Sequence, residues 1–233
     1  MLTIYKSFPQ VLAISFDLDD TLYDNMPIIQ AAENKLLNYI IEKFPAFSEL
    51  DEVTWQHKKS LFTQKNQRLA HDVSLLRKHF LTDLLVSANV AKASSSALQA
   101  YEYFHQHRNN FMVAPSCIEL LYKMKQKVPL IAITNGNADP DLIGLSGIFD
   151  AVIRPQNELL MKPDKAIFEL GSKQLNIPAK NIVHVGDSHI TDVQGAINSN
   201  MIAGWFNPSK VAFPGAVLPE FEYTNTEDLL NLI

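Results

Sequence analysis

Five short apolar runs mark the chain, at residues 11–16, 128–133, 149–153, 182–185 and 201–206. A run of this length between polar residues indicates a strand that is buried on both faces, as in a parallel sheet. Helical patterns begin at Pro115 and cover residues 166–175 and 190–198. Because strands and helices alternate, the sequence predicts an α/β fold with a Rossmann-like, doubly wound parallel sheet.

The segment between the first two runs has a different pattern. Apolar residues recur there with the 3.6-residue period of an amphipathic helix, for example at Leu36 and Ile40. We therefore expect residues 26–110 to form an all-helical domain. This domain is inserted into the α/β domain, which consists of residues 1–25 and 111–233.

The composition narrows the range of partners. The formal net charge is −5, so no basic field attracts nucleic acid or anionic lipid. Cys117 is the only cysteine, which excludes an intrachain disulfide, and we expect it to be a small hydrophobic core residue. No apolar run approaches the length of a membrane span. We expect a cytoplasmic protein, a monomer or a weak homodimer, that binds a small molecule.

Chemically reactive side chains follow the predicted strands. Asp17 and Asp19 come after the first run, and Thr134 follows the second. Asp187 follows the fourth run, with Asp192 about one helical turn further on. Open parallel sheets bind ligands at the carboxyl ends of their strands, so we expect these side chains to lie together.

Two further segments belong to the same edge. Lys162 lies in a loop before Pro163, and Asn135 and Gly136 follow Thr134 with two backbone amides. The edge then carries four carboxylates, one ammonium group and one hydroxyl group. Carboxylates held this close need a counter-cation or shifted pKa values. Each of these motifs is common on its own. Their occurrence in this order, each at the end of a strand, is strong evidence for a single functional site. His184, by contrast, lies inside an apolar run, where we expect a hydrogen-bonded core histidine.

This set of side chains suits phosphoryl transfer with Mg²⁺, which prefers carboxylate and phosphate oxygens as ligands. Asp17 can attack phosphorus and form an aspartyl phosphate. Asp19 can protonate the leaving oxygen and then activate the attacking water. Thr134, the two amides after it and Lys162 can stabilise the phosphoryl charge. The predicted catalytic residues are Asp17, Asp19, Thr134 and Lys162, and the predicted substrate-binding residues are Thr134, Asn135, Gly136 and Lys162.

The motifs resemble those of the haloacid dehalogenase superfamily. They comprise residues 17–22, 134–136, 162–163 and 186–188, together with Asp192. The resemblance covers nearly all of the α/β domain and identifies the helical insert with that superfamily's C1 cap. It implies that the carboxylates of Asp17 and Asp187 and the backbone carbonyl of Asp19 hold Mg²⁺. Asp192 would support the same site, directly or through water.

A narrower resemblance concerns the substrate. Residues 16–25, 71–73, 133–138, 175–178 and 184–187 are similar to segments of bacterial phosphatases of this superfamily. Those enzymes act on flavin mononucleotide and on 5-amino-6-(5-phospho-D-ribitylamino)uracil in riboflavin biosynthesis, and the resemblance implies one of these substrates. Ser188 stands where that group often has a second aspartate, a difference that leaves the metal ligands in place.

Other activities use parts of the same motif set. Another sugar or nucleotide monophosphate is an alternative substrate, and a phosphomutase passes through the same intermediate. Haloacid dehalogenases share the nucleophile but lack the acid two residues on, because a halide needs neither a proton nor a metal. A receiver-like signalling domain is shorter and has no cap. A non-catalytic binding protein would be expected to lack Asp17, Asp19 or Lys162, and all three are present.

Overall fold

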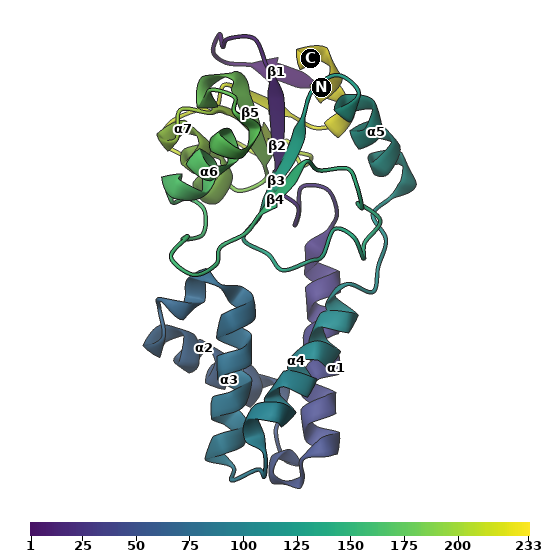
Figure 1. Cartoon of the computed structure of the whole chain (residues 1–233), viewed down its shortest axis with the longest axis vertical. Helices are drawn as coiled ribbons and strands as arrows, with labels where there is room; N and C mark the ends of the chain where they lie inside the picture. Colours follow the sequence, from purple (N-terminus) through teal and green to yellow (C-terminus); the bar gives the residue numbers. More distant parts are fainter. The chain divides into compact units, whose positions relative to one another are not determined.

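The computed structural model describes residues 1–233, and the chain divides into two compact units (Figure 1). The core unit consists of Met1–Asp24, Met112–Gly136 and Pro140–Ile233. The helical unit consists of Asn25–Phe111 together with Asn137–Asp139. The sequence pattern does not predict that this last segment belongs with the helices. A hydrogen bond of 2.6 Å from the Asp139 amide to Asn109 Oδ1 attaches it there.

The core unit is built on one seven-stranded sheet. Its strands are β1 (Leu2–Ile4), β2 (Ala13–Phe16), β3 (Leu130–Ile133), β4 (Ala151–Ile153), β5 (Ile182–Gly186), β6 (Ile202–Phe206) and β7 (Phe221–Tyr223). They lie in the order β1-β7-β6-β5-β2-β3-β4, and every neighbouring pair except β1 and β7 is parallel. Helices α6 (Lys165–Leu175) and α7 (Gly195–Asn198) cover one face, and α5 (Pro115–Lys125) covers the other (Figure 1). The predicted Rossmann-like α/β fold is confirmed.

The sheet is wider than the sequence pattern predicts. Strands β1 and β7 pair in antiparallel orientation at one edge, with Leu2 opposite Tyr223. Neither strand was expected, so the prediction that the last strand lies within residues 201–206 is wrong. Each of the two has only three residues, which is too short for an alternating pattern to stand out in the sequence.

The register of the central strands brings the ends of three strands level. Strand β2 lies between β3 and β5, so that Phe16 is opposite Ala132 on one side and Val185 on the other. The Asp17 amide continues the ladder with a hydrogen bond of 2.9 Å to the Val185 carbonyl. The residues that follow these strands therefore meet at one edge of the sheet.

These central strands are buried throughout, as their largely apolar sequence predicts. On the face covered by α6, Ile167 and Phe168 pack in one cluster with Ile131 and Ile133 of β3. A site that starts at the ends of such strands has a rigid base, which holds reactive groups at fixed distances.

Four longer helices form most of the helical unit, namely α1 (Asn25–Lys43), α2 (Glu52–Lys65), α3 (Val73–Ser87) and α4 (Ala93–Arg108). Shorter 3₁₀ segments of the chain are Pro45–Phe47, Leu69–His71, Ala179–Asn181 and Thr226–Leu232, and His189–Gln194 is a π-helical turn. Asp51 caps α2 by accepting a hydrogen bond from the Thr54 amide, and Asp72 caps α3 in the same way.

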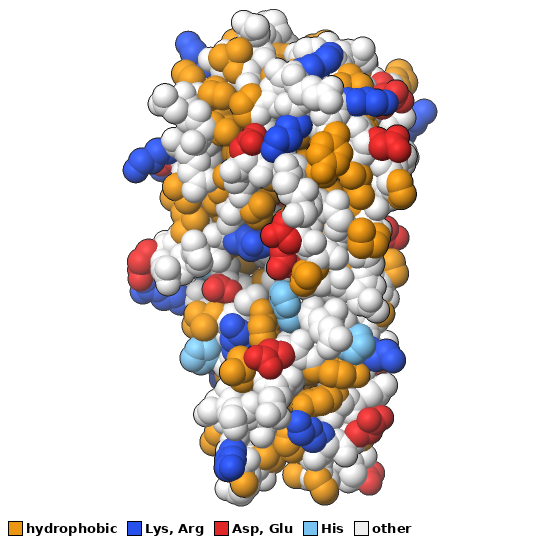
Figure 2. All heavy atoms as spheres, turned by 45° about the vertical axis from the view of Figure 1, so that its right-hand side comes forward, with side chains coloured by type: hydrophobic (Ala, Val, Ile, Leu, Met, Phe, Trp, Pro, Cys, Tyr) orange, Lys and Arg blue, Asp and Glu red, His pale blue; other side chains and the backbone are white.

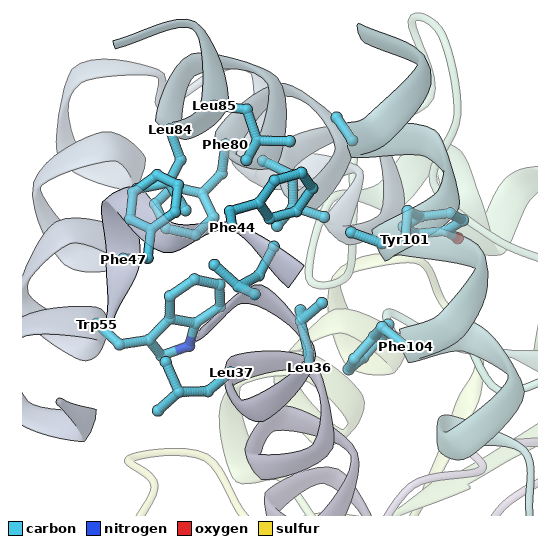
Figure 3. Close-up of a cluster of buried hydrophobic side chains, with 14 of the residues drawn as sticks. Leu36, Leu37, Phe44, Phe47, Trp55, Phe80, Leu84, Leu85, Tyr101 and Phe104 are labelled. Atoms are coloured by element: carbon cyan, nitrogen blue, oxygen red, sulfur yellow. The ribbon is translucent and has the colours of Figure 1, made fainter. Parts of the chain in front are cut away.

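One apolar core joins the four helices of this unit (Figure 3). Leu36 of α1, Trp55 of α2, Phe80 of α3 and Phe104 of α4 all contribute to it. The rings of Trp55 and Phe80 meet edge to face with centroids 5.1 Å apart, a favourable geometry for aromatic pairs. Each helix thus buries its apolar face within its own unit.

Cys117 was predicted to be a core residue, but it is only partly buried. It is half-buried in α5 and lines an open groove of about 910 Å³ together with residues 20–24. Burial raises the pKa of its thiol to about 11, so the thiol is protonated at neutral pH. A nucleophilic role for Cys117 has no support.

The surface has no dominant charge on the face that Figure 2 presents, where acidic and basic side chains are interspersed. No helix combines the length and the apolar character needed to cross a membrane.

The core of the helical unit generates a stability prediction. Leu36 is fully buried, so Leu36→Ala should lower the free energy of unfolding by about 2–5 kcal/mol through lost burial and the cavity left behind. Leu98→Ala, at a position that is 48% exposed on α4, is the matched control and should change it by less than about 0.5 kcal/mol. Urea unfolding followed by circular dichroism measures both. Equal effects of the two substitutions would contradict the described core.

Candidate active site

Lys162 is at the centre of the site. Its side chain is only 1% exposed, and its ammonium group donates hydrogen bonds of 2.6 Å to Asp17 Oδ1 and to Asp192 Oδ1. A buried ammonium group is stable only when opposite charges compensate it. Although burial lowers the pKa of Lys162, the two carboxylates outweigh this and hold the pKa above its usual value. Lys162 is therefore charged and fixed between two aspartates.

Asn135 holds the backbone of Lys162. The Lys162 amide donates to Asn135 Oδ1 at 2.8 Å, and Asn135 Nδ2 donates to the Lys162 carbonyl at 3.0 Å. Two reciprocal hydrogen bonds tie the end of β3 to the loop before α6. The side chain of Asn135, which the sequence placed among the substrate-binding residues, is thus bound to the protein itself. The backbone amide of Asn135 is still predicted to bind the substrate.

Asp192 is buried, and protein donors bind both of its oxygens. Oδ1 accepts from Lys162, and Oδ2 accepts from the Ser188 amide at 3.0 Å. A Cβ atom at position 186 would overlap the Asp192 carboxyl group, so only glycine permits this close approach. Burial raises the pKa of Asp192, but Lys162 and His184 together outweigh burial and hold this pKa below its usual value. These contacts orient Asp192 toward Lys162.

His184 extends the same buried network. Its Nδ1 lies 2.8 Å from Ser15 Oγ, and its Nε2 lies 3.3 Å from Asp192 Oδ1. Burial lowers the pKa of His184 to about 4, so the ring is neutral at physiological pH. The expectation of a hydrogen-bonded core histidine is confirmed. The sequence does not indicate that one of its partners is Asp192.

Asp19 lies on a tight turn after β2. Asp20 has a left-handed backbone with φ of 61°, and its amide donates to the Tyr23 carbonyl at 2.9 Å. The Tyr23 hydroxyl donates to Asp19 Oδ1 at 2.5 Å. A Cβ atom at Gly136 would overlap Asp19 Oδ2, so this glycine lets the carboxyl group approach the end of β3. The order of the motifs along the sequence predicts that these two meet, but it does not predict the contact with Tyr23.

Thr134 and Gly136 belong to the turn that follows β3. Thr134 is buried, and its hydroxyl oxygen accepts a hydrogen bond of 3.0 Å from the Gly136 amide. Thr21 lies on the other side and donates from Oγ1 to Asp17 Oδ2 at 3.4 Å. The Thr21 hydroxyl beside Asp17 and the hydroxyl group of Thr134 are therefore potential donors to an anion.

Three carboxylates lie close enough to bind one metal ion. Asp17, Asp187 and Asp192 each offer an oxygen, and these three oxygens lie within 4.8 Å of one another. Asp17 and Asp192 are buried, and Asp187 is half-buried. The side chain of Asp19 does not belong to this trio. The backbone carbonyl of Asp19 is still predicted to bind the metal ion.

The charge balance of the trio fits a divalent cation. If all three carboxyl groups were ionised, they would face one ammonium group and negative charge would be in excess. Burial raises the pKa of Asp17 to about 8, and burial together with Asp192 raises the pKa of Asp187 to about 6. A cation would reverse both shifts by favouring the ionised forms. Carboxylate oxygens are ligands of the kind that Mg²⁺ prefers.

Comparison with known proteins agrees with the geometry. The chain is 33% identical over 235 residues to the 5-amino-6-(5-phospho-D-ribitylamino)uracil phosphatase YigB of Escherichia coli (strain K12), and the match covers 98% of this chain and 99% of that protein. It is 24% identical over 213 residues to the N-acylneuraminate-9-phosphatase of Homo sapiens, with 87% and 85% of the two chains covered.

A solved structure shares the fold. The crystal structure of 2-haloacid dehalogenase from Pseudomonas syringae pv. Tomato DC3000 superimposes with a TM-score of 0.89 at 29% sequence identity, and the match covers 96% of this chain and 98% of that one. The model of the haloacid dehalogenase-like hydrolase family matches residues 11–200, which include every residue of the site described above. The chain therefore belongs to the haloacid dehalogenase-like hydrolase family.

Proposed function

We propose that this protein is a Mg²⁺-dependent phosphatase that hydrolyses a small phosphorylated metabolite through an aspartyl phosphate on Asp17. The observation that carries the proposal is the pairing of Asp17 with the buried Lys162, beside Asp19 and the Thr134–Gly136 turn. Several relatives in the family are named as phosphatases or nucleotidases, which supports a phosphoric monoester hydrolase.

Asp17 is the proposed nucleophile. Its Oδ1 is bound by Lys162, which leaves Oδ2, near Thr21, as the oxygen that attacks phosphorus. As the new bond between this oxygen and phosphorus forms, the bond from phosphorus to the leaving oxygen breaks. Lys162 offsets the negative charge of the carboxylate and of the approaching phosphoryl group. Thr134 and the amides that follow it are the proposed donors to the phosphoryl oxygens.

Asp19 is the proposed general acid and base. In the first step it protonates the leaving oxygen, and in the second it removes a proton from the water that attacks the aspartyl phosphate. Such proton transfer contributes roughly 10²–10⁴-fold to the rate. Asp19 Oδ2 lies against Gly136, which supports this role, because the turn that contains Gly136 carries the proposed phosphoryl-binding amides.

Asp17, Asp187 and the backbone carbonyl of Asp19 are the proposed ligands of Mg²⁺, with Asp192 in support. When bound, the ion supplies charge neutralisation for the nucleophile and the phosphoryl group. Because Lys162 and the Ser188 amide already bind both oxygens of Asp192, we propose that it acts mainly on Lys162 and through water.

A haloacid dehalogenase is the competing function, because the P. syringae protein of that name has a very similar fold. Asp19 and the carboxylate trio favour the phosphatase. A halide leaves without a proton, so dehalogenation needs no general acid two residues after the nucleophile. Nor does it need three carboxylates that fit a cation.

Flavin mononucleotide or 5-amino-6-(5-phospho-D-ribitylamino)uracil is the proposed substrate. The support is the 33% identity over nearly the full length of both chains with the E. coli enzyme named for the second compound. Relatives named for N-acylneuraminate 9-phosphate or pyrimidine nucleotides are less similar. Phosphate release from this set of compounds, compared as kcat/KM, tests the proposal, and a higher value for a sugar or pyrimidine phosphate would refute it.

Replacement of the nucleophile gives the first functional prediction. Asp17→Asn should abolish hydrolysis of p-nitrophenyl phosphate, because an amide is nearly isosteric with the carboxylate but far less nucleophilic. Asp83→Asn on α3 is the matched control and should retain the wild-type rate. Circular dichroism should show both variants folded. Substantial turnover by a clean preparation of Asp17→Asn would rule out the assignment.

Removal of the metal ion gives the second functional prediction. Hydrolysis should stop in EDTA and return with Mg²⁺ or Mn²⁺, because excess carboxylate charge needs a cation. Ca²⁺ should not restore it, since its larger and looser coordination shell allows Asp17 to bind through both oxygens and removes the attacking oxygen. The assay is phosphate release after dialysis against chelator. Full activity in EDTA would contradict the metal requirement.

A further inference from the structure

The hydroxyl group of Tyr23 contacts the proposed acid and base, and no established role accounts for it. We infer that Tyr23 is a positioning residue: it holds Oδ1 of Asp19 so that Oδ2 is the oxygen that gives and takes the proton. The inference rests on the proposed phosphatase function and adds to it a determinant of how basic a leaving group the enzyme accepts.

The first support is the bond itself. Tyr23 donates to Asp19 Oδ1 at 2.5 Å, a short hydrogen bond between two oxygen atoms. The two residues are fixed within one turn, since the Asp20 amide binds the Tyr23 carbonyl and the Leu22 amide binds the Leu18 carbonyl. Tyr23 is therefore held by the backbone at the position where its hydroxyl meets Asp19.

The second support is the place of the other oxygen. A Cβ atom built on Gly136 would overlap Asp19 Oδ2, and the same point lies 3.4 Å from Thr134 Oγ1. Oδ2 therefore lies beside Gly136, on the side of the donors proposed to bind the phosphoryl group, while Oδ1 is bound by Tyr23. The two oxygens of one carboxyl group therefore have different surroundings: Tyr23 binds Oδ1, and Oδ2 lies beside Gly136.

The chemistry assigns each oxygen a task. In the first step, the proton on Oδ2 moves to the leaving oxygen, which keeps the electron pair of its broken bond to phosphorus. Asp19 becomes a carboxylate whose charge the Tyr23 hydroxyl stabilises. In the second step, Oδ2 takes a proton from water as the water oxygen bonds to phosphorus, and the electron pair of the aspartyl phosphate bond returns to Asp17. Asp19 ends protonated again, so the cycle balances.

Leaving groups of different basicity separate this role from a merely structural one. Tyr23→Phe keeps the ring and removes only the hydroxyl. Its kcat/KM should fall about tenfold for phenyl phosphate, a part of the roughly 10²–10⁴-fold that acid–base catalysis supplies. For p-nitrophenyl phosphate, whose leaving group needs little protonation, it should fall less than about twofold. Tyr122→Phe removes the same atom from a tyrosine that is 46% exposed on α5, and both of its values should stay at the wild-type level.

A double-mutant cycle tests whether Tyr23 acts through Asp19. In an Asp19→Ala background, Tyr23→Phe should cause no further loss with phenyl phosphate, because the group it positions is gone. An equal loss for both esters, or a full additional loss in the Asp19→Ala background, would overturn the inference and leave the phosphatase function standing. If the wild-type protein hydrolyses neither ester, the proposed function and the inference fail together.

Discussion

A buried ammonium group between two buried carboxylates is the interaction on which this structure depends. Removing one member of such a cluster leaves an uncompensated charge in the interior, which typically costs about 3–5 kcal/mol. The fold therefore fixes Lys162 from both directions, through Asn135 at its backbone and through Asp17 and Asp192 at its side chain. Gly186 and His184 also support this cluster. Gly186 leaves space for the carboxyl group of Asp192, and His184 forms a hydrogen bond with it.

The same cluster explains why the site suits phosphate. Lys162 compensates only part of the charge of Asp17, Asp187 and Asp192, so the site favours a cation. A cation beside a carboxylate nucleophile allows a second anion, the phosphoryl group, to approach. In the proposed mechanism, substrate, metal and nucleophile form one electrostatic unit, and Asp19, which Tyr23 binds, transfers the protons.

Much of this site could be predicted from the sequence because it lies at the ends of buried parallel strands. Asp17, Thr134 and Asp187 each follow an apolar run, and parallel register alone brings such residues to one edge. The contacts that hold the site were not predictable, since they join loops through side-chain geometry that no pattern encodes. The reciprocal bonds of Asn135 and the reach of His184 to Asp192 are of this kind. Strands β1 and β7 could not be predicted, because a strand of three residues is too short to show a two-residue alternation of apolar and polar side chains.

Chemical trapping tests most directly whether Asp17 becomes covalently phosphorylated, as the proposed mechanism requires. Asp19→Asn should slow hydrolysis of the intermediate, so this variant is mixed with p-nitrophenyl phosphate and Mg²⁺, quenched with acid and treated with borohydride. Borohydride reduces an acyl phosphate to an alcohol, which converts the phosphorylated aspartate to homoserine. Peptide mass spectrometry should find homoserine at position 17 and at no other aspartate. Unmodified Asp17 in a sample that has released nitrophenol, or homoserine at a different position, would contradict the mechanism.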